Sequence, residues 1–135
     1  YTFSMGETAE NVAREWKISR EAQDEFAFAS QTKYQAAHEV NKFADEIIGV
    51  EILSKKETIV FRKDEHPRLS SLAELAKLKP AFAKDGTVTA GNTSGINDGA
   101  AATLIVSEKF LKEHNLKPLA RVVAIGVAGV HPSIM

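Results

Sequence analysis

The sequence predicts an α/β protein, in which a mainly helical region with a small hairpin precedes strands of a mixed α/β sheet that this chain leaves incomplete. Two observations predict this class. Between residues 4 and 40, apolar residues return every three or four positions, as on one face of a helix. Between residues 100 and 130, two runs are apolar at nearly every position, which is typical of strands covered on both faces.

Composition narrows the class of protein. The chain has 135 residues, 44% of them hydrophobic and 26% charged, which suits one globular domain. A net charge of -1 gives no general attraction to nucleic acid or to an anionic membrane. The longest apolar runs fall far short of the ~20 residues that span a bilayer, and we expect no secretory signal within these residues, since no basic start precedes an apolar run. We expect a cytoplasmic protein, or an organellar one if a targeting segment precedes Tyr1.

Two helices are expected in the first part of the chain. Ser4 and Glu7 have the spacing of a capping box, and the residues that follow repeat with helical period up to Trp16. Ser19 can cap a second helix over residues 20–40. Its expected apolar face comprises Ala22, Phe26, Ala29, Ala36, Ala37 and Val40. We expect solvent exposure for Arg20, Glu21, Asp24 and Lys33.

The middle of the chain predicts a hairpin and a short helix. Residues 46–53 and 58–62 are rich in β-branched residues, with a turn at 54–57 between them. Residues 70–79 return to helical spacing, and Pro80 ends that helix.

Beyond a glycine-rich segment, the pattern predicts a strand at 101–106, a helix at 107–115 and a strand at 120–130. Two doubly covered strands cannot form a sheet alone, so other strands must come from outside these residues or from another copy. The chain also begins at Tyr1 rather than at a methionine and ends directly after an apolar run. From these features we expect an incomplete chain.

The glycine-rich segment holds Gly91, Gly95 and Gly99 at every fourth position. The Walker phosphate motif fails here, because Ile96 and Asn97 follow Gly95 where Lys and Ser or Thr are required. The dinucleotide fingerprint fails because its glycines are spaced differently. Two interpretations stay open from the residues alone. The segment offers a narrow ligand a bare backbone and the Ser94 hydroxyl, or it is a tight connection that binds nothing.

Neither a metal nor a cysteine site is expected. The chain has no cysteine, which excludes a disulfide, a thiolate metal site and a cysteine nucleophile within these residues. The histidines show no metal-ligand spacing and receive no role; they are His38, His66, His114 and His131.

Five segments, taken in order, closely resemble the thiolase family of the acetyl-CoA acetyltransferase type. They are Met5–Ala13, Ser19–Gln31, Asp64–Arg68, Leu75–Phe82 and Gly86–Ala102. The resemblance implies a thiolase-like fold. It implies that residues 1–95 are part of the coenzyme A-binding loop domain, that 96–117 return to the N-terminal half, and that 118–135 are the first strand of the C-terminal half.

The same resemblance implies an acyl-CoA C-acyltransferase. Thiolases join two acetyl-CoA molecules into acetoacetyl-CoA by a Claisen condensation, or cleave 3-ketoacyl-CoA with coenzyme A in reverse. The family uses two cysteines, one to carry the acyl group and one to move protons. Since this chain has no cysteine, we expect the 135-residue segment alone to be inactive. The implied partners are coenzyme A and acyl-CoA as substrates, the remaining thiolase domains, and a second copy in a dimer or tetramer, with no separate cofactor.

The resemblance places coenzyme A against Ser94, Ala90, Phe82, Ala81, Leu75, Arg68 and Met5. Ser94 corresponds to a serine that bonds the pantetheine arm, with Ala90 beside it. The guanidinium of Arg68 suits the adenosine end, where it can pair with phosphate or stack on the base. A carboxylate near that end is unfavourable, so we expect Glu74 to point to solvent.

The other residues suit the thin arm and the acyl end. Phe82 and Ala81 correspond to tunnel walls, Leu75 to an apolar contact near the nucleotide, and Met5 to the reacting acyl end. Without the family, Met5 and Phe82 are ordinary core residues and Arg68 an ordinary surface residue. The alternative function is a stand-alone, non-catalytic module that binds acyl-CoA or a protein partner.

Overall fold

The computed structural model describes residues 3–54 and 57–135, in two units. The first unit comprises residues 1–95 together with His131–Met135, and the second comprises Ile96–Val130. The division into thiolase segments at 95 and 117 remains a prediction. Among the described residues, no helix is both long enough and apolar enough to cross a membrane.

Helix α1 (Met5–Glu15) begins as its sequence predicts. The Ser4 side chain accepts a hydrogen bond from the Glu7 backbone N–H at 3.2 Å, and the Glu7 carboxylate accepts one from the Ser4 N–H at 2.8 Å. These two bonds complete the expected capping box and satisfy two donors that a helix start leaves free. The backbone bond from Ser4, and then the bond to its side chain, lower the pKa of Glu7.

Helix α2 (Arg20–Glu39) is the longest helix of the described structure, and Ser19 caps it as predicted. The prediction of which α2 side chains are exposed to solvent is wrong in the first half of the helix. Asp24 is only 4% exposed, whereas Phe26 is 80% exposed. Asp24 can be buried because both of its carboxylate oxygens have partners, Arg20 and Asn92. The two polar residues expected in solvent at positions 20 and 24 therefore face the interior of this unit.

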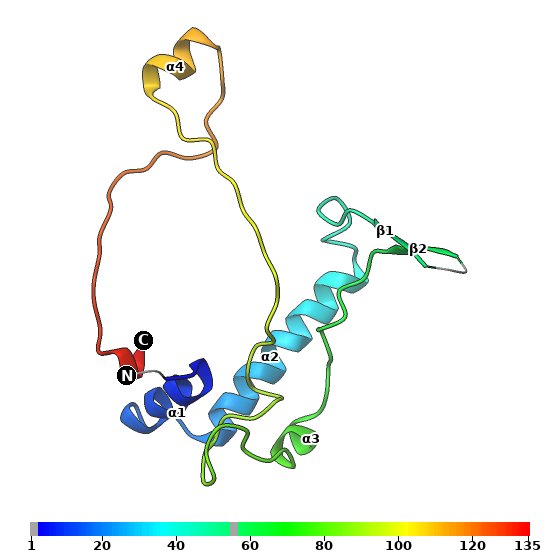
Figure 1. Ribbon diagram of the computed structural model, residues 1–135, viewed down its shortest axis with the longest axis vertical. Coiled ribbons are helices and arrows are strands. Elements are labelled where there is room, and N and C mark those ends of the chain that lie inside the picture. The colour runs from blue at the N-terminus through cyan, green and yellow to red at the C-terminus, as the bar shows by residue number, and fades with distance from the viewer. Residues whose placement is uncertain (1–2, 55–56) are drawn as a thin grey trace. The chain divides into compact units, whose positions relative to one another are not determined.

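The hairpin and the third helix form where the sequence predicts them. Strands β1 (Val50–Leu53) and β2 (Thr58–Phe61) pair antiparallel, with Val50 opposite Phe61. The predicted turn lies partly outside the described residues. Helix α3 (Leu72–Ala76) is capped by Ser71 and is shorter than predicted. Figure 1 shows α3 beside the first turns of α2 and the hairpin beyond the other end of α2.

A one-turn helix at the end of the chain, η1 (Pro132–Ile134), packs against α1 and was not expected from the sequence. The Asn11 amide donates a hydrogen bond to the Ser133 carbonyl at 3.0 Å, which joins residues far apart in the sequence.

The second unit contains α4 (Glu108–Glu113), capped by Ser107 within the predicted range. The strands predicted at 101–106 and 120–130 are not formed: these residues carry no regular structure in the described part of the chain. Most of their side chains are exposed to solvent, and Ile125 is 87% exposed. The physical reason is that a strand needs a neighbour for its backbone hydrogen bonds, and the described structure pairs no neighbour with either segment.

Candidate functional site

A cavity of about 230 Å³ lies in the first unit between α2, α3 and residues 90–93. Three of the seven predicted contact residues line it: Arg68, Leu75 and Ala90. Residues from α2, including Phe28 and Gln31, form another side. The structure therefore brings together side chains that are 22 positions apart in the sequence, Arg68 and Ala90.

A hydrogen bond connects the Arg68 side of the cavity to α2. The backbone N–H of Arg68 donates a hydrogen bond to the Gln31 side chain at 2.9 Å, while the Arg68 residue itself is exposed. His66, to which the sequence assigned no role, also lines the cavity. An exposed guanidinium at the rim can meet an anionic or aromatic group without losing an internal partner.

Leu75 forms the apolar wall and is 6% exposed. It lies on α3, which begins at Ser71 because that side chain accepts a hydrogen bond from the Glu74 N–H at 3.2 Å. Glu74 also borders the cavity, but its side chain is 61% exposed and pairs with Lys77 at 2.7 Å. The expectation that Glu74 points to solvent is therefore confirmed.

The opposite wall is a tight turn around Thr89, which is fully buried. The Asn92 side chain accepts a hydrogen bond from the Thr89 N–H at 2.7 Å and donates to the Thr87 carbonyl at 3.0 Å. Asn92 thus holds its own turn, as asparagine often does. Asn97 and Asp98, farther along the chain, are exposed and make no hydrogen bond within the part of the chain described.

The packing around Gly91 explains one of the three regularly spaced glycines. A Cβ at Gly91 would lie 2.5 Å from Leu78 Cδ1 and 2.6 Å from Leu75 Cδ2. The absence of a side chain at Gly91 therefore lets Leu75 and Leu78 pack closely against this turn. At Gly99, by contrast, a Cβ would meet nothing within 4 Å in the described structure.

A buried carboxylate from α1 holds the start of the same segment. Glu10 is 6% exposed, and its Oε1 accepts hydrogen bonds from the backbone N–H groups of Thr87 at 2.9 Å and Val88 at 2.8 Å. The Thr87 hydroxyl donates to Oε2 of Glu10 at 3.2 Å and accepts from Gln23 at 2.9 Å. Sequence reasoning missed Glu10. A signal was present, since Glu10 lies beside the apolar positions of its helix.

The other four predicted residues lie outside this cavity. Ser94 is exposed, and its hydroxyl has no hydrogen-bond partner in the described structure. Ala81 is exposed, with its N–H bonded to the Val88 carbonyl at 2.9 Å. Phe82 packs over Gly6, where an added Cβ would overlap the ring. Met5 is 66% exposed and borders a separate cavity of about 290 Å³, together with Val12 and Met135.

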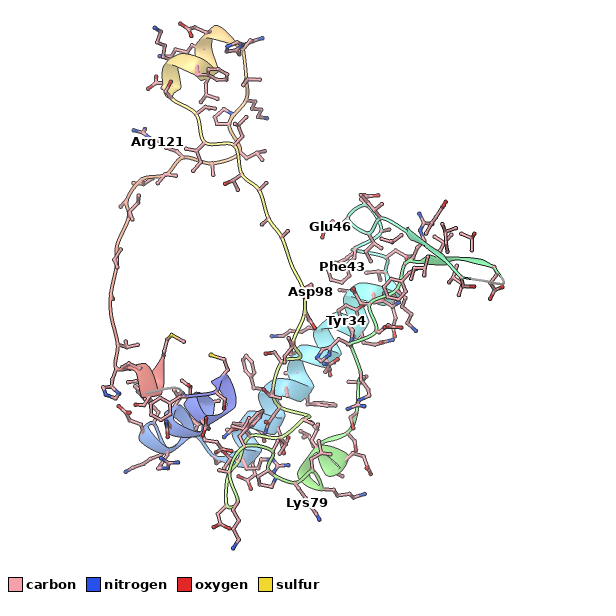
Figure 2. The ribbon with its side chains drawn as sticks, viewed as in Figure 1. Tyr34, Phe43, Glu46, Lys79, Asp98 and Arg121 are labelled. Carbon is pink, nitrogen blue, oxygen red and sulfur yellow. The ribbon has the colours of Figure 1, made fainter. Side chains whose placement is uncertain are left out.

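An aromatic cluster lies near the C-terminal end of α2. The Tyr34 ring stacks on His38 and on Phe43, with both pairs of ring centroids 5.7 Å apart. Figure 2 shows Tyr34 and Phe43 near each other there. Partial burial raises the pKa of Tyr34, and the nearby Asp64 carboxylate acts in the same direction. None of these residues lines the cavity.

Within residues 3–54 and 57–135, no group of three or more His, Asp or Glu side chains could hold a metal ion. The polar side chains around the cavity are those of an arginine, a histidine, a glutamine, a glutamate, a serine and a threonine. Such groups can bind a ligand through hydrogen bonds and charge.

Comparison with known proteins identifies the family. The model of the thiolase N-terminal domain matches residues 1–109. An acetyl-CoA acetyltransferase of Rhizobium meliloti (strain 1021) is 51% identical over 136 residues, covering 100% of this chain and 35% of that protein. The chain therefore belongs to the thiolase family, and its helices with a small antiparallel hairpin fit the α/β thiolase fold.

Two solved structures support the assignment. The acetyl-CoA acetyltransferase of Bacillus anthracis superposes with a TM-score of 0.87 at 50% identity, covering 99% of this chain and 34% of that one. Human mitochondrial 3-ketoacyl-CoA thiolase in complex with CoA gives a TM-score of 0.81 at 49% identity, covering 98% of this chain and 33% of that one. The chain thus spans about a third of the length of the relatives it matches.

Proposed function

We propose that this chain supplies the coenzyme A-binding part of an acyl-CoA C-acyltransferase. The full protein joins two acetyl-CoA molecules into acetoacetyl-CoA and cleaves 3-ketoacyl-CoA in reverse. The observation that carries the proposal is the cavity that brings Arg68, Leu75 and Ala90 together in a chain that belongs to the thiolase family. The CoA complex of a 49% identical human relative supports the same ligand.

The residues have complementary roles in this proposal. The exposed Arg68 guanidinium meets the charged adenosine end, and the buried Leu75 offers an apolar surface beside it. The partner-free hydroxyl of Ser94 is open to an amide of the pantetheine arm. Ala90, Ala81 and Phe82 flank the path of the arm, and Met5 lies toward the acyl end.

The chain itself has no cysteine, so the reacting thiols of a thiolase come from outside these residues. We also propose that the exposed apolar residues of 101–106 and 120–130 become buried strands in the full-length protein. The proposed division is residues 1–95 as the loop domain, 96–117 as the return to the N-terminal half, and 118–135 as the first strand of the C-terminal half. A dimer or tetramer is the expected assembly, which light scattering measures.

The test is the change Ser94→Ala in the full-length thiolase that contains these residues. Losing one hydrogen bond to the arm costs about 1 kcal/mol, so the KM for coenzyme A in the thiolysis of acetoacetyl-CoA should rise about fivefold. The matched control is Ser30→Ala, because Ser30 is exposed on α2 and does not line the cavity.

Three outcomes are informative. A rise in KM for Ser94→Ala alone supports the assignment. Equal KM values for the wild type and both variants would show that Ser94 does not contact the arm. Coenzyme A binding without any thiolysis in the full-length protein would favour the non-catalytic binding module over the enzyme.

A further inference from the structure

The two walls of the cavity come from distant segments, and one face of α2 holds both. Leu75 and Leu78 belong to α3 and its end, whereas Ala90 and Gly91 belong to the turn around Thr89. Arg20 and Asp24 lie one helical turn apart on α2 and contact both segments. Neither residue lines the cavity.

Arg20 holds the α3 wall. Its Nη2 donates hydrogen bonds to the carbonyls of Leu75 at 2.6 Å and Leu78 at 3.0 Å. The Leu75 carbonyl also accepts a hydrogen bond from the Leu78 N–H at 3.0 Å, and a cation beside the carbonyls at a helix end is favourable. A helix of 5 residues is also too short to hold its own position in water. The place of Leu75 therefore depends on the Arg20 side chain.

Asp24 joins Arg20 to the other wall. Its Oδ2 accepts from Arg20 Nε at 2.8 Å, and its Oδ1 accepts from the Asn92 amide at 2.9 Å. Asn92 in turn fixes the backbone of Thr87 and Thr89, directly before Ala90. The side chains of Arg20 and Asp24 are 19% and 6% exposed, so water competes little for these bonds. A continuous path of hydrogen bonds thus runs from α3 to the turn.

We propose that Arg20 and Asp24 are positioning residues that set the spacing between the two cavity walls and thereby the affinity for coenzyme A. This inference rests on the proposed function. Neither residue touches the ligand or the reacting groups; each acts through the placement of Leu75 and Ala90. Because the walls hold the ligand alike before and during the reaction, disturbing them weakens binding without slowing the chemical step.

The test uses Asp24→Asn and Arg20→Lys in the full-length thiolase. An asparagine side chain has one acceptor oxygen for the two donors that Asp24 now serves, and a lysine lacks the fork that reaches Asp24 and two carbonyls together. We expect the KM for coenzyme A to rise about tenfold in each variant while kcat changes by less than about twofold. The double variant should be no worse than either single variant, because both break the same path.

Matched controls make the same chemical changes at exposed sites. Asp45→Asn and Arg62→Lys lie away from the cavity lining and should keep the KM of the wild type. If Asp24→Asn does not fold, Asn92→Ser breaks the path at a less buried residue, and the same rise in KM is expected.

The outcomes separate this inference from the proposed function. If the wild type turns over acetoacetyl-CoA and Ser94→Ala raises KM, but the Arg20 and Asp24 variants match their controls, the inference is wrong and the function stands. If the variants only lower the yield of folded protein while its KM stays unchanged, their role is structural and the inference is again wrong. A wild type that neither binds coenzyme A nor shows thiolysis overturns both proposals.

Discussion

The first unit of the chain buries charged and polar groups, whereas none of the described residues 96–130 of the second unit is buried. In residues 3–95, Glu10, Asp24 and Thr89 are among the most buried residues. In residues 96–130, four large apolar residues are at least 78% exposed: Leu104, Ile105, Ile125 and Val127. The first unit is thus held by hydrogen bonds whose partners lie within it, while the second lacks the surfaces that would cover its side chains.

The difference shows how a polar network can replace part of a core. The described buried hydrophobic residues are few: Ala13, Leu75 and Val88. Glu10 and Asp24 connect α1 and α2 to the segment that carries the candidate site. Such networks are costly to break, because a buried polar group that loses its hydrogen-bond partner still bears its full desolvation penalty.

The largest effect is expected from Ile125→Asp in the full-length protein. If other parts of that protein cover residues 120–130, an unpaired carboxylate is buried there, and the free energy of unfolding should fall by about 4 kcal/mol. In the 135-residue chain the same change should have almost no effect, since Ile125 is 87% exposed.

Thermal unfolding of both proteins, with Ile125→Val as the control, measures this contrast. A full-length protein that tolerates Asp at this position would show that residues 120–130 stay exposed and do not form the proposed strand.

A smaller loss is expected from Glu10→Ala in the first unit. The change leaves the N–H groups of Thr87 and Val88 without their acceptor, at a cost of about 3 kcal/mol in the free energy of unfolding. Amide hydrogen exchange at these two residues should accelerate, because their N–H groups become open to water. Glu15→Ala, at an exposed position of the same helix, serves as the control. Unchanged exchange at both amides would contradict the role of Glu10.

The smallest effect is expected at the capping box of α1. The pKa of Glu7 is lowered in the folded protein, chiefly by the hydrogen bond from the Ser4 N–H. Its carboxylate therefore adds stability above the ordinary value of 4.5, and this contribution is lost as the pH falls through the lowered pKa.

The measurement compares the unfolding midpoints of the wild type and Glu7→Gln from neutral pH down to the lowest pH at which both proteins stay folded. The wild type should have the higher midpoint at neutral pH, and the two should converge in acid. A difference that persists unchanged at the low pH would mean that the charge of Glu7 is not its source.

Local signals predicted most helix starts and the hairpin. Ser4 and Ser19 cap helices in the structure as the sequence predicts. Ser71 and Ser107 also cap helices, at the start of regions predicted only as helical. The information lies within three residues of each cap, so no distant contact is needed to read it. The β-branched runs of the hairpin likewise lie close together in the sequence, with a short turn between them.

Part of the candidate site could also be predicted. The resemblance to thiolases selected seven residues, of which Arg68, Leu75 and Ala90 line one cavity and four do not. Contact with coenzyme A stays a prediction for all seven. Helical periodicity instead placed Asp24 in solvent, because it treats every carboxylate as a solvated group. Asp24 is instead buried with two hydrogen-bond partners, Arg20 and Asn92, and Asn92 is 68 positions away in the sequence.

The sequence by itself determined the family, the caps and the absence of a cysteine nucleophile, since these depend on which residues are present and on short spacings. Only the tertiary structure decided which polar groups are buried and which side chains pack against Gly91. Glu10 meets residues 87 and 88, and Gly91 meets Leu75 and Leu78, through contacts between segments that the chain brings together only on folding. Burial is a property of those contacts, so spacing along the chain cannot supply it.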